Sequence, residues 1–116
     1  MPRYIDCFVI PVPKKNLTAY KKMAKTSAKA WLKAGALDYF ETLADDAPKG
    51  KVTSFPQSVQ LKAGEVLVLG CAVYKSRAHR DRVMAKVHRD EALMALWENM
   101  PFDGMRMIFG GFKKLV

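Results

Sequence analysis

The sequence predicts an α+β fold in which the elements follow one another as strand, helix, strand, strand, helix, strand. Three observations lead to this prediction. Residues 4–10 alternate between two sets of side chains, as a strand does. Residues 17–31 repeat apolar side chains at intervals of three and four, which is the helical period. Residues 65–74 are almost unbroken apolar, which is typical of a central strand.

The length and the composition indicate a globular protein. The 116 residues are expected to form one domain, 1–116. No apolar run approaches the ~20 residues of a membrane span. The N-terminal Met-Pro-Arg-Tyr-Ile-Asp has a proline and an acid where a signal peptide has its apolar core. We therefore expect a cytoplasmic protein that does not contact a membrane.

The formal charge of +9 is high for this size and leaves two interpretations open. It indicates an acidic partner, such as nucleic acid or an anionic metabolite, or simply a well-solvated surface. The two cysteines, Cys7 and Cys71, lie in apolar strand-like runs, so we expect buried free thiols. No Cys/His spacing suits zinc, and we expect no metal and no cofactor.

The first predicted strand has two different faces and ends at Pro11-Val12-Pro13. One face carries an acid among large side chains: Tyr4, Asp6, Phe8 and Ile10. The other is wholly aliphatic or thiol: Ile5, Cys7 and Val9. We expect the second set to pack under helices, because it contains no charge.

The next elements are a helix and an edge strand. The helix is expected over 16–34, with Asn16 as N-cap and Gly35 as its stop. The strand is expected over 36–43, where carboxylates such as Glu41 would discourage edge-to-edge pairing. Residues 45–64 show little periodicity, and a loop of that length is typical of a lid or of a segment covered by a partner.

After the apolar strand 65–74, two helices and a final strand complete the chain. Ser76 is expected to cap a basic helix over 77–89, and Asp90 a shorter apolar one that ends before Pro101. Asp103-Gly104 predicts a turn, and 105–109 the last strand, with Arg106 inside it.

With right-handed crossovers these elements form a ferredoxin-like βαββαβ fold. We expect a four-stranded antiparallel sheet of order 4-1-3-2 with the helices on one face. We also place strands one and three at the centre as a parallel pair. The uncovered face would carry Tyr4, Phe8 and Ile10, a larger apolar patch than monomers leave exposed. A homodimer of two such sheets, a dimeric α+β barrel, is the expected solution.

Asp6 and Arg106 form the principal candidate site. They lie near the middles of strands expected to pair, so they would meet across the sheet. Arg106 would then clamp a carboxylate or phosphate beside Asp6, or the two would form a structural ion pair. Tyr4 and Phe8 would line the same site. His79 is either an acid/base at its edge or a surface histidine.

Recognition of nucleic acid through the sheet is disfavoured. The central strand, 66–73, lacks the aromatic residues on which an RNA recognition motif stacks bases, and the basic residues lie on the helices. Phosphate binding by those helices stays open. Trp31 and Trp97 fit helical stripes, which favours packing over a substrate platform.

Three blocks in order carry a resemblance to a known family. They are the segments 4–16, 45–56 (Asp-Asp-x-Pro-x-Gly-Lys-Val-Thr-Ser-Phe-Pro) and 100–112 (Met-Pro-Phe-Asp-Gly-x-Arg-Met-Ile-Phe-Gly-Gly-Phe). Over essentially its whole length the chain resembles the YbaA-like family of small bacterial proteins. That resemblance implies the dimeric α+β barrel superfamily, which includes antibiotic-biosynthesis monooxygenases. The family usually has glycine where this chain has Cys7, so close backbone approach there is not implied.

The expected function is therefore that of a homodimer that binds a small anionic or aromatic molecule between sheet and loops, with cofactor-independent catalysis as an extension of this role. The alternative is an interaction module that meets an acidic partner or nucleic acid through its basic helices.

Overall fold

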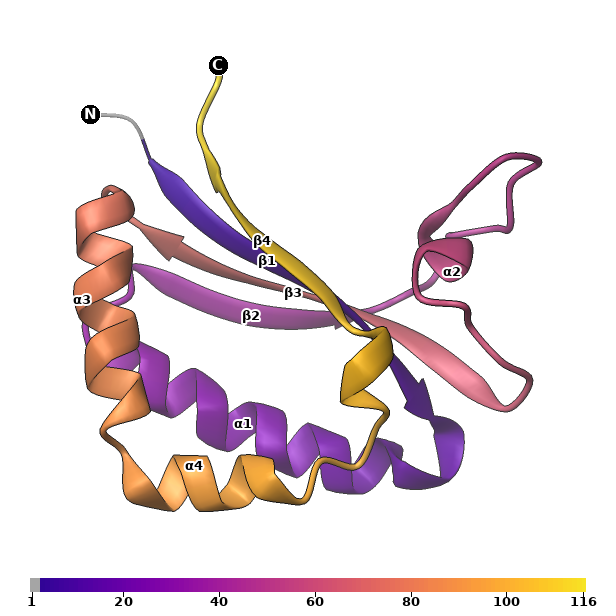
Figure 1. Ribbon diagram of the computed structural model, residues 1–116, viewed down its shortest axis with the longest axis horizontal. Helices are drawn as coiled ribbons and strands as arrows, with labels where there is room; N and C mark the ends of the chain where they lie inside the picture. Colours follow the sequence, from indigo (N-terminus) through magenta and orange to yellow (C-terminus); the bar gives the residue numbers. More distant parts are fainter. Residues whose placement is uncertain (1–2) are drawn as a thin grey trace.

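The computed structural model describes residues 3–116 and contains one four-stranded sheet of order β2-β3-β1-β4 (Figure 1). The strands are β1 (Tyr4–Pro13), β2 (Asp38–Leu43), β3 (Glu65–Tyr74) and β4 (Ile108–Lys113). This order is the predicted 4-1-3-2, and the ferredoxin-like prediction is confirmed. Met1 and Pro2, on which the argument against a signal peptide partly rests, lie outside the described residues.

Three helices lie together along one face of the sheet (Figure 1). They are α1 (Leu17–Lys33), α3 (Arg77–His88) and α4 (Glu91–Glu98). Ser76 and Asp90 cap α3 and α4 as predicted, each accepting a backbone N–H three residues on. Asn16 occupies the N-cap position of α1 as predicted but makes no capping hydrogen bond with its side chain, whose amide donates to the carbonyl of Pro101 at 3.0 Å.

The two central strands are antiparallel, so the predicted parallel pair is wrong. In a split βαβ unit the strands joined by α1 are β1 and β2, and these run the same way with β3 reversed between them. β1 also continues to Pro13, beyond the predicted end. Its pairing with β4 stops at Val9, so the prolines lie where β1 has a neighbour on only one side.

The predicted assignment of the two faces of β1 is also wrong. Phe8 and Ile10 lie under the helices, where Ile10 packs in a cluster with Tyr20 and Met23 of α1. Asp6 shares this covered face. The carboxylate is tolerated there because distant groups hydrogen-bond it, as described below.

The opposite side of the sheet, here called the open face, has no helix layer of its own. Its side chains come from all four strands: Ile5, Cys7, Val9, Phe40, Leu69, Cys71, Val73, Ile108 and Phe112. Cys7 and Cys71 are directly paired in the register, and both are half-buried free thiols with their Sγ atoms 3.7 Å apart.

The loop 44–64 covers one end of the open face. It contains the short helix α2 (Phe55–Ser58) and rises on the side of the sheet away from the other helices (Figure 1). Val59, 1% exposed, packs against Val9 and Leu67 of the sheet, so this part of the loop is anchored.

The last strand begins later than predicted. Residues 104–106 form a 3₁₀ turn, and β4 starts only at Ile108. The Asp103 carboxylate causes this: it accepts the backbone N–H of Met105 at 3.0 Å and the Arg106 Nε–H at 2.9 Å. Arg106 therefore lies before the strand and does not face β1.

Candidate functional site

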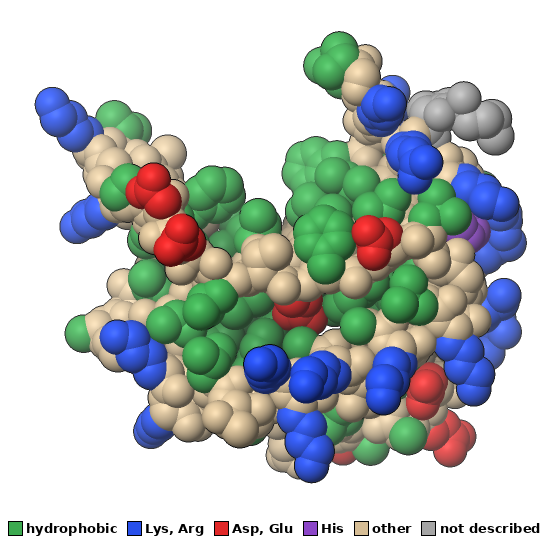
Figure 2. All heavy atoms as spheres, turned by 180° about the vertical axis from the view of Figure 1, so that it is seen from behind, with side chains coloured by type: hydrophobic (Ala, Val, Ile, Leu, Met, Phe, Trp, Pro, Cys, Tyr) green, Lys and Arg blue, Asp and Glu red, His purple; other side chains and the backbone are tan. Residues whose placement is uncertain are grey.

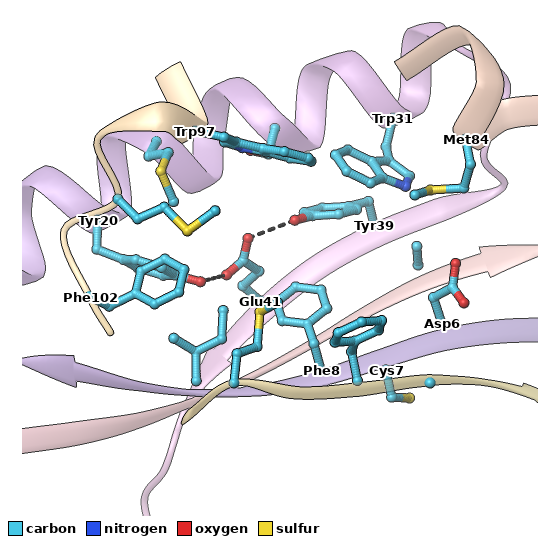
Figure 3. Close-up of a pocket in the computed structure, with 18 of the residues that line it drawn as sticks. Asp6, Cys7, Phe8, Tyr20, Trp31, Tyr39, Glu41, Met84, Trp97 and Phe102 are labelled. Atoms are coloured by element: carbon cyan, nitrogen blue, oxygen red, sulfur yellow. Dashed lines mark hydrogen bonds between the residues drawn. The ribbon is translucent and has the colours of Figure 1, made fainter. Parts of the chain in front are cut away.

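A cavity of about 340 Å³ lies between the sheet and the helix layer (Figure 3). Most of its lining is aromatic, methionine or aliphatic, and we call it the aromatic cavity. Its principal residues are Phe8 and Ile10 of β1, Tyr39 and Glu41 of β2, and Tyr20, Met23 and Trp31 of α1. The lining also includes Arg80, Met84 and His88 of α3, Trp97 of α4, Ala72 of β3, and Asp6, Phe102 and Phe109.

Aromatic rings from three elements form one side of the cavity. The Trp31 ring lies 5.2 Å from that of Tyr39 and 5.4 Å from that of Trp97, both in tilted contact. The Trp97 indole N–H donates to Ser27 Oγ at 3.3 Å, which fixes its orientation. The tryptophans predicted as packing residues thus also line an open space.

Glu41 projects into the cavity between two tyrosines (Figure 3). The Tyr39 hydroxyl donates to Glu41 Oε2 at 2.7 Å, and the Tyr20 hydroxyl donates to Glu41 Oε1. Burial raises the pKa of both tyrosines, and the Glu41 charge raises it further. Both hydroxyls therefore keep their protons at neutral pH, so each binds Glu41 as a hydrogen-bond donor.

A second polar cluster lies at the other end of the cavity, around Asp6. Arg80 Nη1 donates to Asp6 Oδ1 at 2.8 Å, and the Tyr74 hydroxyl donates to Asp6 Oδ2 at 3.1 Å. The Trp31 indole N–H in turn donates to the Tyr74 oxygen at 3.0 Å. Burial raises the pKa of Asp6, and Arg80 and Tyr74 offset that effect only in part.

A shallower groove of about 420 Å³ runs along the outside of this site, between α1 and β2. It shares Tyr20, Tyr39 and Glu41 with the aromatic cavity, so this cluster forms the wall between the two spaces. Lys21 and Lys25 border the groove, and basic side chains follow the helix layer beside a hollow in Figure 2.

The predicted pairing of Asp6 with Arg106 is wrong. Asp6 lies opposite Gly111 of β4, and its ionic partner is Arg80. Arg106 instead makes a two-pronged ion pair with Glu65, at 2.8 and 2.5 Å. It also donates to the carbonyl of Gln60 at 3.0 Å, so it attaches the end of the loop 44–64 to the sheet.

The other predicted site residues divide between the cavity and its surroundings. Phe8 lines the cavity beside Asp6. Tyr4 lies outside the lining, with the Arg80 guanidinium 5.0 Å from its ring centre. His79 is also outside it: its Nδ1 accepts the backbone N–H of Lys75 at 2.9 Å, and its ring meets Tyr74 edge-on.

The Tyr20–Glu41–Tyr39 cluster was not predicted, although the sequence contains two signals for it. Tyr39 and Glu41 alternate on one face of a predicted strand, and Tyr20 lies in the apolar stripe of the predicted helix. A charged residue on the same face as a buried aromatic one requires a partner. From the sequence, Glu41 is assigned only the role of discouraging edge-to-edge pairing of the sheet.

Residues 3–116 contain neither a cluster of metal ligands nor a membrane-spanning helix. No group of three or more His, Cys, Asp or Glu side chains in this part of the chain is placed to hold a metal ion. None of its helices combines the length and the apolar character needed to cross a membrane.

The family of the chain follows from sequence comparison. Residues 3–104 match the model of DUF1428, described as a protein of unknown function. This chain is a member of the DUF1428 family. It is 39% identical over 114 residues to the uncharacterized protein YbaA of Escherichia coli (strain K12), with 98% of this chain and 97% of that protein covered. YbaA of Shigella flexneri gives the same values. The predicted YbaA-like resemblance is confirmed.

Solved structures resemble this DUF1428 protein in fold. A dimeric ferredoxin-like protein from an uncultured marine organism is 14% identical, with a TM-score of 0.53 over 100% of this chain and 96% of that one. Rv0793 from Mycobacterium tuberculosis is 10% identical, with a TM-score of 0.54 over 100% and 97%. At such identities the likeness concerns the fold alone.

The segment matched by the DUF1428 model contains the polar groups of the cavity. Asp6, Tyr20, Glu41 and Arg80 all lie within residues 3–104. Phe109 of β4 lies beyond it, on the edge strand.

Proposed function

We propose that this protein binds a small aromatic molecule in the aromatic cavity. One observation carries the proposal: a cavity of about 340 Å³ lies inside the protomer, with an apolar lining and few polar groups. Binding sites for small molecules have this composition, because apolar walls supply affinity and a few polar groups supply orientation.

The lining favours an aromatic ligand over the anionic one that the sequence also suggested. Two carboxylates, Asp6 and Glu41, face the cavity against the guanidinium of Arg80. That guanidinium is already paired with Asp6 and Asp81, both at 2.8 Å. Apart from the imidazole of His88, the described lining residues therefore offer an anion no basic group that is not already paired.

Indole is a suitable first probe, because it is flat, neutral and small enough for the cavity. We expect binding by isothermal titration calorimetry with a Kd near or below ~1 mM, which corresponds to about 4 kcal/mol. Met84→Trp places a larger side chain in the cavity and should abolish binding. Met105→Trp is the matched control, because Met105 is 93% exposed.

Two results would contradict the proposal: no heat of binding from indole, or equal affinity in the Met84 and Met105 variants. Ala72→Leu provides a second way to fill the cavity if the Met84 variant does not fold. Ala72 is 2% exposed and also lines the cavity, so its binding curve should change in the same direction.

We propose further that two copies pack their open faces together as a homodimer, a dimeric α+β barrel. Large side chains are left uncovered there, with Phe40 46%, Leu69 40%, Ile108 44% and Phe112 57% exposed. They come from β2, β3 and β4, and Cys7 and Val9 of β1 lie between β3 and β4 on the same face, so the apolar surface runs across the sheet. The structural relative from the marine organism is itself named dimeric, and its fold is the same.

Light scattering tests the dimer. The chain mass is 13.1 kDa, so two copies give about 26 kDa. Leu69→Lys would place an unpaired charge at the centre of the interface on each copy, and should shift the mass to that of one chain. Leu32→Lys is the control, since Leu32 is similarly exposed, 48%, but lies on α1. A wild-type monomer, or an unchanged mass for the Leu69 variant, would contradict the dimer.

A further inference from the structure

Glu41 is a charged group in an apolar setting without a cationic partner. The ion pairs among residues 3–116 involve Asp6, Glu65, Asp81 and Asp103, and none involves Glu41. Lys21 and Lys25 border the outer groove, but neither forms an ion pair with Glu41. This half-buried carboxylate is therefore held by two neutral hydroxyls and by no cation among the described residues.

The tyrosines leave part of Glu41 available. A carboxylate offers about four lone-pair positions, and the two hydroxyls occupy one on each oxygen. Because both tyrosines remain protonated at neutral pH, they orient the carboxylate but do not remove its charge. Glu41 lines both the aromatic cavity and the outer groove, so its remaining positions are available to a molecule bound beside it.

The rings around the carboxylate add to the attraction for positive charge. Trp31, Trp97 and Tyr39 stand on the helix side of Glu41, and Phe8 on the sheet side (Figure 3). The faces of aromatic rings carry partial negative charge and bind ammonium groups, tryptophan most strongly. The whole chain has a charge of +9, yet its cavity presents two carboxylates against one guanidinium and the imidazole of His88.

We propose that the ligand of the aromatic cavity is a small organic cation, an ammonium or protonated amine carried on an aromatic body. The ammonium group would lie against Glu41, and the body among Trp31, Trp97 and Phe8. This inference rests on the proposed function, because it names the chemical class of the molecule bound in the same cavity.

Three probes with one ring system separate charge from shape: tryptamine is a cation, tryptophol is neutral and indole-3-acetate is an anion. At about 150 mM salt, where long-range effects of the net charge are screened, we expect tryptamine to bind at least ~10-fold more tightly than tryptophol. Indole-3-acetate should bind most weakly. All three are measured by calorimetry on the full-length protein.

The carboxylate is tested by Glu41→Gln, which keeps an acceptor for one tyrosine and removes the charge. We expect this variant to lose the ~10-fold preference for tryptamine while tryptophol affinity changes little. Glu98→Gln is the matched control, since Glu98 is exposed on α4 and lies outside the cavity lining. It should keep the preference.

The possible outcomes separate this inference from the proposed function. If tryptophol or indole-3-acetate binds as tightly as tryptamine to the wild-type protein, the ligand is not selected by positive charge, although the cavity still binds aromatic molecules. A preference that persists in Glu41→Gln would also overturn the inference. If none of the three binds, both the inference and the proposed function are wrong.

Discussion

Replacing Tyr74 by phenylalanine tests whether the polar cluster around Asp6 stabilises the fold. Tyr74 is 0% exposed, and its hydroxyl serves two partners: it accepts the Trp31 indole N–H and donates to Asp6. The substitution keeps the ring and removes only the oxygen. It therefore leaves a buried donor on Trp31, itself 7% exposed, without a partner.

The expected loss of stability is about 2–4 kcal/mol. A buried donor left unsatisfied costs about 1–3 kcal/mol. The lost hydrogen bond to the Asp6 carboxylate adds about 1 kcal/mol, the value of an ordinary hydrogen bond, because Arg80 still holds that group. For a domain of this size, each kcal/mol lowers Tm by roughly 4 °C, so the total shift is about 8–16 °C.

Urea unfolding followed by circular dichroism measures the difference in unfolding free energy directly. Tyr4→Phe is the control, because its hydroxyl lies at 3.3 Å from Arg80 Nη2 on a half-buried side chain. We expect that control to stay within about 0.5 kcal/mol of wild type. If Tyr74→Phe costs no more than Tyr4→Phe, the cluster does not stabilise the fold and the reasoning fails.

Three further changes probe other contacts. Gly70→Ala would place its Cβ 2.0 Å from the Phe8 ring, so we expect the free energy of unfolding, measured in urea, to fall by about 1–3 kcal/mol. Gly110→Ala should cost little, because the nearest neighbour of its Cβ lies at 3.6 Å. Equal losses in the two variants would contradict this. Arg106→Ala should detach the end of the loop 44–64 from the sheet, so we expect trypsin to cleave the variant faster while its affinity for indole stays unchanged. An altered affinity would indicate that Arg106 contributes to the binding site. The hydrogen bond from Arg106 lowers the pKa of Glu65 from its ordinary 4.5. The stability that this ion pair gives the fold is therefore complete above about pH 4.5 and is lost as the pH falls through the lowered pKa. Glu65→Gln should therefore lose less stability than wild type between about pH 5 and pH 3, and parallel curves would exclude this role.

The sequence predicted the elements well where local signals decide them. The strand at 65–74 matches β3 residue for residue, because a long apolar run has few alternatives. The caps at Ser76 and Asp90 were predicted since each side chain bonds a backbone group three residues away. The order of the elements then led to the sheet order with little ambiguity.

The sequence failed where a distant contact decides the outcome. Asp6 was assigned to the uncovered face because its partners Tyr74 and Arg80 lie 68 and 74 residues away, and no local pattern reveals them. Arg106 was placed in a strand by the β-propensity of its neighbours, but the side chain of Asp103 bends the chain first. These two errors together produced the wrong candidate pair.

The two proposed binding surfaces share the same strands and alternate along them. In β1 and β3 the even-numbered side chains, such as Phe8 and Ala72, face the helix layer, and the odd-numbered ones, such as Cys7 and Leu69, face away. Neighbouring residues of a strand thus belong to different surfaces, so a single substitution changes one surface and leaves the other unchanged. Inserting or deleting a single residue in either strand would exchange the two sets beyond that point. These strands can therefore diverge by substitution, while their lengths must stay fixed.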